Sequence, residues 1–193
     1  MKKIVGIFLL VLLCNKIGYS QKNVVFTSLE AALSVSIDSV FHLDLSKQKL
    51  KEVPSVVFEF KQLLTIDISK NEIKKIPLEI KNLKHLQVLN AEKNQLNQFP
   101  VGLCNCVQLT NLNLGRNDIE SIPICFGQLI DLSAVDLWDN PLSGLPESIQ
   151  NLKKLNALDM RGINLNTAVK DKLNAWLPNT EIKFDNGCDC GGI

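Results

Sequence analysis

The stretch "DISKNEIKKIP" (Asp67–Pro77) returns later in the chain as "NLGRNDIESIP" (Asn113–Pro123). Two further copies are "NAEKNQLNQFP" (residues 90–100) and "DLWDNPLSGLP" (residues 136–146). Each copy keeps an Asn, an aliphatic residue and a Pro at fixed places, and the copies start 23 residues apart. A fixed period in the twenties predicts a solenoid, because each turn is too small to bury its own apolar face.

Each turn divides into a strand, a bend and a return. In "LQVLNAEKN" (Leu86–Asn94), Leu89 and Ala91 alternate with polar residues, which is typical of a short, half-buried strand. Stacking such strands predicts a parallel sheet along one side. The segment "PLEIKNLKHL" (Pro77–Leu86) has apolar residues three apart, which predicts a short helical or 3₁₀ return.

The repeated Asn lies where the strand ends and the chain bends inward. Its side-chain amide can both donate and accept, so it can satisfy backbone groups of its own turn and of the neighbouring turn. We therefore expect a structural ladder of Asn71, Asn94, Asn117 and Asn140.

The pattern "LxxLxLxxNxLxxLPxxIxxL", carried by "LTNLNLGRNDIESIPICFGQL" (Leu109–Leu129), resembles the typical leucine-rich repeat. Its length and its "IP/LP" placement are similar to the 23-residue class found in plant Ras-group, Scribble-like and bacterial proteins. The resemblance covers residues 40–165. It implies an α/β, right-handed solenoid with a concave parallel β-sheet and short helical or 3₁₀ convex returns, used mostly to bind other macromolecules.

The chain ends do not follow the repeat and are expected to differ from it. Residues 21–39 carry "TSLEAALSV", with Ser28 placed to cap a short helix, and form an N-terminal helical cap. Residues 166–193 carry a capping helix in "NTAVKDKLNAWLP", which buries Val169, Leu173 and Trp176. A last strand in "TEIKF" and a loose tail with two cysteines follow.

Residues 1–20 form an export signal. "MKK" is a cationic start, and "IVGIFLLVLL" (Ile4–Leu13) is an apolar run of about 15 Å as a helix, too short to span a bilayer. We expect cleavage after Ser20 and a secreted or periplasmic protein with no transmembrane segment in the mature chain. Lipidation at Cys14 and an uncleaved anchor are the weaker alternatives, since Leu13 is bulky for a lipoprotein signal.

The strand alternation also predicts which side chains face outward from the sheet. The outward-facing Asp and Asn residues form a central column, and the residues just before the ladder positions form a corner column near the bend. We expect the partner-binding face to use Asp44, Asp67, Asn90, Asn113, Asp136 and Asp159 from the first and Lys47, Lys70, Lys93, Arg116 and Asp139 from the second. Trp138 and Arg161 lie between them. The competing interpretation is a solvated sheet surface whose charges compensate one another.

Trp138 is the strongest sign of a binding site on this face. Trp and Arg dominate interface energies, and a Trp projecting from a strand toward water is unusual. We name the set of Trp138, Arg116, Asp136, Asp139 and Arg161 the Trp138 patch, and we expect a partner to contact it.

No catalytic, cofactor or metal site is expected. His42 and His85 fall on opposite sides of the predicted solenoid, and no phosphate loop or zinc spacing occurs. Cys106 shares a column with core leucines and is expected to be a core residue. Pairing among Cys104, Cys125, Cys188 and Cys190 stays open, although Cys104 and Cys125 lie on adjacent returns and can pair if their Cα atoms are within about 7 Å.

The sequence thus predicts a non-catalytic binding protein that recognises a protein, or a glycan, and is a monomer. The formal net charge of +1 gives no sign of a nucleic-acid partner. The alternatives are a cell-envelope structural or adhesion protein and a regulatory subunit or inhibitor of an exported enzyme.

Overall fold

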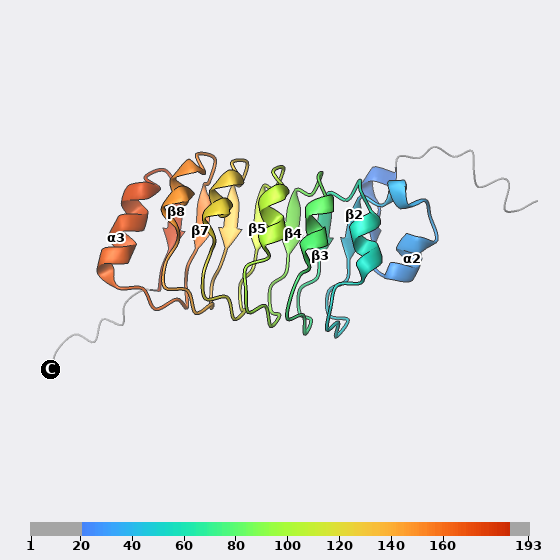
Figure 1. Cartoon of the computed structure of the whole chain (residues 1–193), viewed down its shortest axis with the longest axis horizontal. Helices are drawn as coiled ribbons and strands as arrows, with labels where there is room; N and C mark the ends of the chain where they lie inside the picture. Colours follow the sequence, from blue (N-terminus) through green and yellow to red (C-terminus); the bar gives the residue numbers. More distant parts are fainter. Residues whose placement is uncertain (1–20, 186–193) are drawn as a thin grey trace, which may run out of the picture.

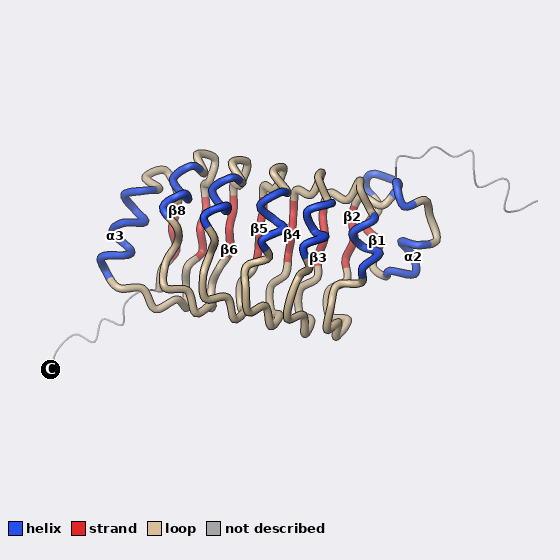
Figure 2. The backbone as a smooth tube through the Cα atoms, in the orientation of Figure 1, coloured by secondary structure: helices blue, strands red, loops and turns tan. Residues whose placement is uncertain are grey.

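A computed structural model describes residues 21–185, and the predicted signal and the cysteines at 188 and 190 lie outside them. Eight strands form one parallel sheet in chain order, and 3₁₀ helices lie side by side on its other face (Figures 1 and 2). The strands are β1 (Val25–Phe26), β2 (His42–Asp44), β3 (Thr65–Asp67), β4 (Val88–Asn90), β5 (Asn111–Asn113), β6 (Ala134–Asp136), β7 (Ala157–Asp159) and β8 (Glu181–Lys183). The predicted solenoid fold is confirmed.

Helical segments make up the returns and close both ends. The 3₁₀ helices are η2 (Gln21–Asn23), η3 (Ile37–Ser39), η4 (Ser55–Glu59), η5 (Leu78–Asn82), η6 (Val101–Asn105), η7 (Ile124–Gln128) and η8 (Glu147–Asn151). The α-helices are α2 (Leu29–Leu33) and α3 (Thr167–Trp176). The Ser28 hydroxyl accepts from the backbone N–H of Ala31, and α3 buries Leu173.

The sheet register equals the sequence period. From β2 to β7 each residue pairs with the residue 23 positions later, so that Leu43 lies beside Ile66 and Ile66 beside Leu89. The inward residue of every one of these strands is buried. One continuous apolar core therefore runs the length of the molecule, and no turn closes it alone.

The bends carry a ladder of asparagine side chains. Asn117 donates to the carbonyl oxygens of Leu114 (2.9 Å) and Ala91 (3.0 Å), and its Oδ1 accepts from the backbone N–H of Leu96 (3.0 Å). Asn71, Asn94 and Asn140 make the same bonds in their own turns. In the first turn Gln48 replaces Asn, and its side chain bonds to the Thr27 carbonyl of the N-terminal segment.

The residue before each ladder position has a left-handed backbone. The φ angles of these corner residues lie between 54° and 60° at Lys47, Lys70, Lys93, Arg116 and Asp139. Gly162 holds the equivalent place in the next turn, with φ 72°. Non-glycine residues adopt this conformation at a cost, and here it turns the chain from the sheet toward the core.

A disulfide joins two neighbouring returns. Cys104 of η6 and Cys125 of η7 are bonded, with their Cα atoms 5.7 Å apart. Cys106 is free and buried, and burial raises the pKa of its thiol to about 11, so it stays protonated. One of the pairings left open by the sequence is thereby assigned.

Candidate functional site

The Asp and Asn side chains of the central column also bond to the backbone of their own turns. In every turn from β2 to β7 the Oδ1 atom of the Asp or Asn accepts a hydrogen bond from the backbone N–H two residues later. Asp44 accepts from Ser46 in this way, and Asp136 accepts from Trp138. Asp and Asn both have an Oδ1 atom that can accept this bond, which explains why the column contains only these two residue types. The second carboxylate oxygen of each Asp is left to meet other groups.

The corner column lies along the edge of the face, where its side chains are largely exposed. Lys93 contacts Glu92 at 3.3 Å, and Arg116 contacts Asp139 at 3.3 Å. Neighbouring acidic groups therefore offset part of the positive charge at this edge. Lys47 and Lys70 are exposed at the N-terminal end of the column.

Trp138 does not project freely into water, as the sequence suggested, but lies half-buried over Gly115 of the preceding turn. A Cβ atom on Gly115 would come within 2.3 Å of the indole ring, so only glycine leaves space for it. The guanidinium of Arg116 lies 5.2 Å from the ring centroid. Gly115 thus belongs to the site, and its place in a column of larger residues, one turn before a Trp, is the sequence signal for it.

The structure arranges the Trp138 patch in two groups. Arg116 bridges the indole and Asp139, while Arg161 binds Asp159 through two nitrogen atoms, with Nε 2.9 Å from Oδ1. Asp136 joins the first group by accepting from the backbone N–H of Trp138.

The two carboxylates at this end differ in their titration. Burial raises the pKa of Asp136 to about 6, with help from the nearby charges of Asp159 and Glu92, although the Trp138 backbone bond and Arg161 oppose the rise. Burial also acts on Asp159, but hydrogen bonds from Arg161 outweigh it and lower the pKa of that carboxyl. A cation placed beside Asp136 would favour the charged form of this carboxyl and lower its pKa again.

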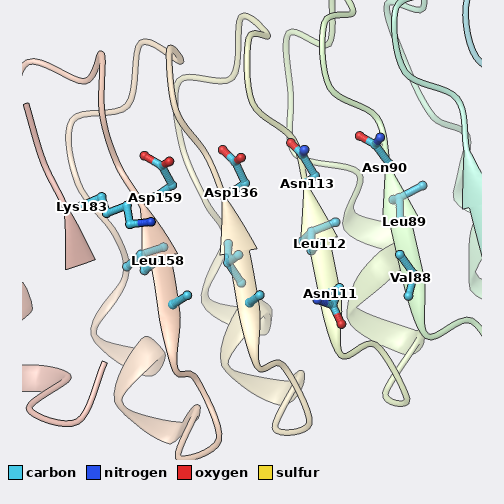
Figure 3. Close-up of a pocket in the computed structure, with 13 residues that line it drawn as sticks. Val88, Leu89, Asn90, Asn111, Leu112, Asn113, Asp136, Leu158, Asp159 and Lys183 are labelled. Carbon is cyan, nitrogen blue, oxygen red and sulfur yellow. The ribbon is translucent and has the colours of Figure 1, made fainter. Parts of the chain in front are cut away.

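A shallow depression of about 350 Å³ lies in the sheet face beside the patch (Figure 3). Its rim is a row of polar tips from Asn90, Asn113, Asp136 and Asp159. It is also lined by the first residues of β4 to β7, which are Val88, Asn111, Ala134 and Ala157, and by Lys183 of β8.

The partner-binding face expected from the sequence did not include these four residues, although the period-two alternation, carried two residues back from the Asp column, predicts that they face outward. Two alanines in that column make the depression, since they leave volume that larger side chains fill elsewhere.

Residues 21–185 contain no group of three or more His, Cys, Asp or Glu residues placed to hold a metal ion. Nor do they contain a helix with the length and hydrophobicity needed to cross a bilayer.

Family models place the chain among known proteins. Models described as leucine rich repeat match residues 38–96 and residues 108–129. The chain is a leucine-rich repeat protein. The register, the ladder and the 3₁₀ returns described above are the physical form of those repeats. No curated protein matches the sequence.

Several solved structures share the leucine-rich repeat fold. Internalin C2 of Listeria monocytogenes is 21% identical with a TM-score of 0.69, over 82% of this chain and 66% of its own. The APL1 leucine-rich repeat domain is 25% identical with a TM-score of 0.62, over 68% and 36%. The ectodomain of the Arabidopsis thaliana receptor kinase GASSHO1/SCHENGEN3, solved with CASPARIAN STRIP INTEGRITY FACTOR 2, is 33% identical with a TM-score of 0.55, over 65% and 15%. The chain thus spans from under a sixth to about two thirds of their lengths.

Proposed function

We propose that this leucine-rich repeat protein is an exported, non-catalytic binding protein that recognises a protein partner through the face of its sheet. The observation that carries the proposal is the half-buried indole of Trp138, seated on Gly115 beside an apolar depression. Large aromatic side chains with fixed orientation and a neighbouring Arg are the usual anchors of protein interfaces. The fold itself is suited to binding, and the GASSHO1/SCHENGEN3 structure gives a precedent for a repeat ectodomain in a complex.

The geometry also suggests what the partner presents. We expect an aliphatic side chain of the partner to pack against Ala134 and Ala157, and a Lys or Arg beside it to reach the carboxylate of Asp136. Because the pKa of Asp136 is raised to about 6, this contact weakens as the pH falls below that value and Asp136 takes up a proton. Binding is therefore strongest at neutral pH.

The first experiment finds the partner. The tagged protein is expressed in its native cells, cross-linked, and purified beside a Trp138→Ala bait. A partner of the proposed kind is enriched with the wild-type bait and reduced with the variant. N-terminal sequencing of the exported protein is expected to begin at Gln21. Retention in the envelope with large assemblies of the chain alone would favour the structural alternative instead.

The second experiment measures the affinity of the purified pair by calorimetry. We expect Trp138→Ala to weaken binding roughly 30-fold, the effect of a hot-spot residue of about 2 kcal/mol. Gly115→Leu, which displaces the indole, should act in the same direction. Asp171→Ala on α3 is the matched control and should leave the affinity within twofold. If Trp138→Ala and Arg161→Ala are also within twofold of wild type, the proposed site is wrong.

A further inference from the structure

The Cys104–Cys125 disulfide and the contact of Trp138 with Gly115 join the same two stretches of the chain. Cys104 lies in η6, which leads into β5 and Gly115, and Cys125 lies in η7, which leads into β6 and Trp138. The returns and the strands form separate layers (Figure 1). These two turns are therefore linked in both layers, by a covalent bond among the returns and by packing at the indole on the sheet face.

Glycines pack each of these two returns against its other neighbour. A Cβ atom on Gly102 of η6 would lie 2.8 Å from the carbonyl oxygen of Leu78 in η5. A Cβ atom on Gly127 of η7 would overlap the carbonyl oxygen of Ser148 in η8. A residue without a side chain is what permits two backbones to approach so closely. Close packing thus holds η6 against η5, and η7 against η8.

Both of these glycine contacts lie away from the boundary between η6 and η7, where side chains make the links. Phe99, which precedes η6, meets Phe126 of η7 edge to face, with the ring centroids 5.6 Å apart. The disulfide lies at the same boundary. Because an aromatic contact is far weaker than a covalent bond, the disulfide is the firmer constraint on the spacing of these two returns.

We propose that this disulfide is a redox-sensitive control on the Trp138 patch, and that a dithiol which reduces it weakens the binding of the partner. The proposal rests on the proposed function of that patch. The backbone bonds between β5 and β6 act as the pivot, because they keep these strands at a fixed spacing. When the disulfide is broken, η6 and η7 can move apart, and the same tilt brings side chains on the opposite face of the sheet closer together.

Trp138 is the side chain most affected by such a tilt. Its indole already lies against Gly115, with no space for even a Cβ atom between them. Its carbonyl oxygen accepts from the backbone N–H of Arg116 at 2.7 Å, so its main chain stays beside the preceding turn. A closer approach of the two turns on this face therefore displaces the indole, and with it the contact to the Arg116 guanidinium. The partner then loses the fixed aromatic anchor that it binds.

Reduction proceeds by thiol–disulfide exchange with a dithiol supplied from outside the chain. One thiolate of the dithiol attacks Cys125, which is partly buried, and the buried Cys104 leaves as a thiolate and takes up a proton. The second thiol of the reductant then attacks the first one in the mixed disulfide, and Cys125 leaves and takes up a proton in turn. Two electrons pass to the protein, both cysteines become thiols, and the reductant is oxidised to a disulfide.

Cys106 lies close to Cys104 in the sequence but does not open the bond itself. It is buried, and its thiol donates to the carbonyl oxygen of Ile80 at 3.4 Å. Burial raises the pKa of this thiol to about 11, so the thiolate that exchange requires is scarce at neutral pH. The redox state of the bond therefore depends on a reductant outside the chain.

Tryptophan fluorescence tests the proposal without a partner. Trp176→Phe leaves Trp138 as the single tryptophan of the full exported chain. Quenching of its fluorescence by acrylamide is measured before and after treatment with dithiothreitol, and mass spectrometry counts the thiols. We expect the quenching constant to rise about twofold on reduction, while circular dichroism stays unchanged.

Two cysteine variants assign the response to this bond. Cys104→Ser/Cys125→Ser keeps Cys188 and Cys190, and it should give the higher quenching constant with and without reductant. Cys106→Ala should respond as the wild type does. An unchanged constant after complete reduction of the bond overturns the proposal. Loss of the circular dichroism signal on reduction also overturns it, because the bond would then be a general structural brace.

Hydrogen exchange of the unsubstituted chain is a second, independent measurement. Reduction should speed exchange of the Arg116 amide, whose bond to the Trp138 carbonyl crosses the two turns, and should leave β3 unchanged. Acceleration spread equally over all strands would show a global loss of stability and would contradict the proposal.

The partner isolated with the wild-type bait tests the effect on binding. We expect reduction to weaken the affinity of the wild type about 10-fold and to add nothing to the loss caused by Trp138→Ala, because the disulfide acts through the indole. The two proposals fail separately. If Trp138→Ala leaves the affinity unchanged, the proposed function is wrong. If Trp138→Ala weakens binding but reduction does not, the redox control is wrong.

Discussion

At the scale of single residues, each turn has two polar positions with different roles, which are the ladder asparagine and the Asp or Asn of the central column. The ladder asparagine, such as Asn117, lies inside the bend and bonds to both its own turn and the preceding one. The Asp or Asn of the central column, such as Asp136, stays at the surface and fixes the end of its strand with one oxygen. The first position is therefore constrained within the inner turns, while the second leaves an oxygen available for recognition.

Replacement of Asn117 by Ala should lower the free energy of unfolding by about 3 kcal/mol, because three backbone groups lose their partners in a buried place. Urea denaturation followed by circular dichroism measures the change. Asn156→Ala, at an exposed position, is the control and should alter stability by less than about 0.5 kcal/mol. Equal effects from both variants would show that the ladder does not hold the turns together.

The pKa of Asp136 predicts a pH effect on stability. Because its folded pKa is raised from 3.8 to about 6, the native state holds its proton more tightly than the unfolded chain does. The resulting stabilisation is complete below about pH 4 and is lost as the pH rises through 6. Asp136→Asn, which places here the residue that β4 and β5 carry, should therefore be more stable than wild type at pH 8, by about 1 kcal/mol after solvent screening.

Asp159→Asn gives the opposite sign and serves as the comparison. The lowered pKa of Asp159 stabilises the fold at neutral pH, and this contribution is lost as the pH falls through the folded value. The variant should therefore be less stable than wild type at pH 7. Urea midpoints measured from pH 4 to pH 8 would contradict the assignment if both variants shifted in the same direction.

At the scale of elements, the sequence predicted most of the strands and helices that recur with the 23-residue period, but few of the features that occur once. The strands, the 3₁₀ returns and a helix near Ser28 follow from spacing and capping residues. The strand β1 is only two residues long, and its apolar alternation is too short to detect. The position of Trp138 over Gly115 depends on a contact between successive turns, so the residues of one turn alone do not predict it.

The disulfide between η6 and η7 should stabilise the middle of the row of returns. It closes a loop with a sequence separation of 21 residues, which corresponds to about 3 kcal/mol through the entropy of the unfolded chain. A Cys104→Ser/Cys125→Ser variant should lose about this much in urea denaturation. Reductant should destabilise the wild type but leave the variant unchanged. A wild type that is equally stable in both conditions would place the stabilisation elsewhere.

At the scale of the whole molecule, stability is a sum of turns and of contacts between neighbouring turns. The terminal turns have a neighbour on one side only and depend on α2 and α3 for cover. The proposed partner also belongs to this scale, and sequence spacing says little about it, because ligand choice resides in the positions that the repeat leaves free.

Amide hydrogen exchange should show this distribution directly. Strands β3 to β6 are expected to be protected longest, and β1 and β8 to exchange first, because openings begin at the ends of the stack. Leu173→Ala, which removes a buried contact of α3, should speed exchange in β8 and β7 and leave β3 unchanged. Uniform acceleration along the chain would indicate a single all-or-none unit instead.

The left-handed corners carry a consequence for engineering. Five successive corners hold Lys, Arg or Asp in a conformation that glycine adopts freely, and the sixth already holds glycine. Substituting glycine at the other five would relieve strain on the order of 1 kcal/mol each, before the extra freedom of the unfolded chain is subtracted. Because glycine also costs up to about 1 kcal/mol through the freedom of the unfolded chain, the two terms nearly cancel, and the charged edge can be exchanged for glycine with little net change in stability.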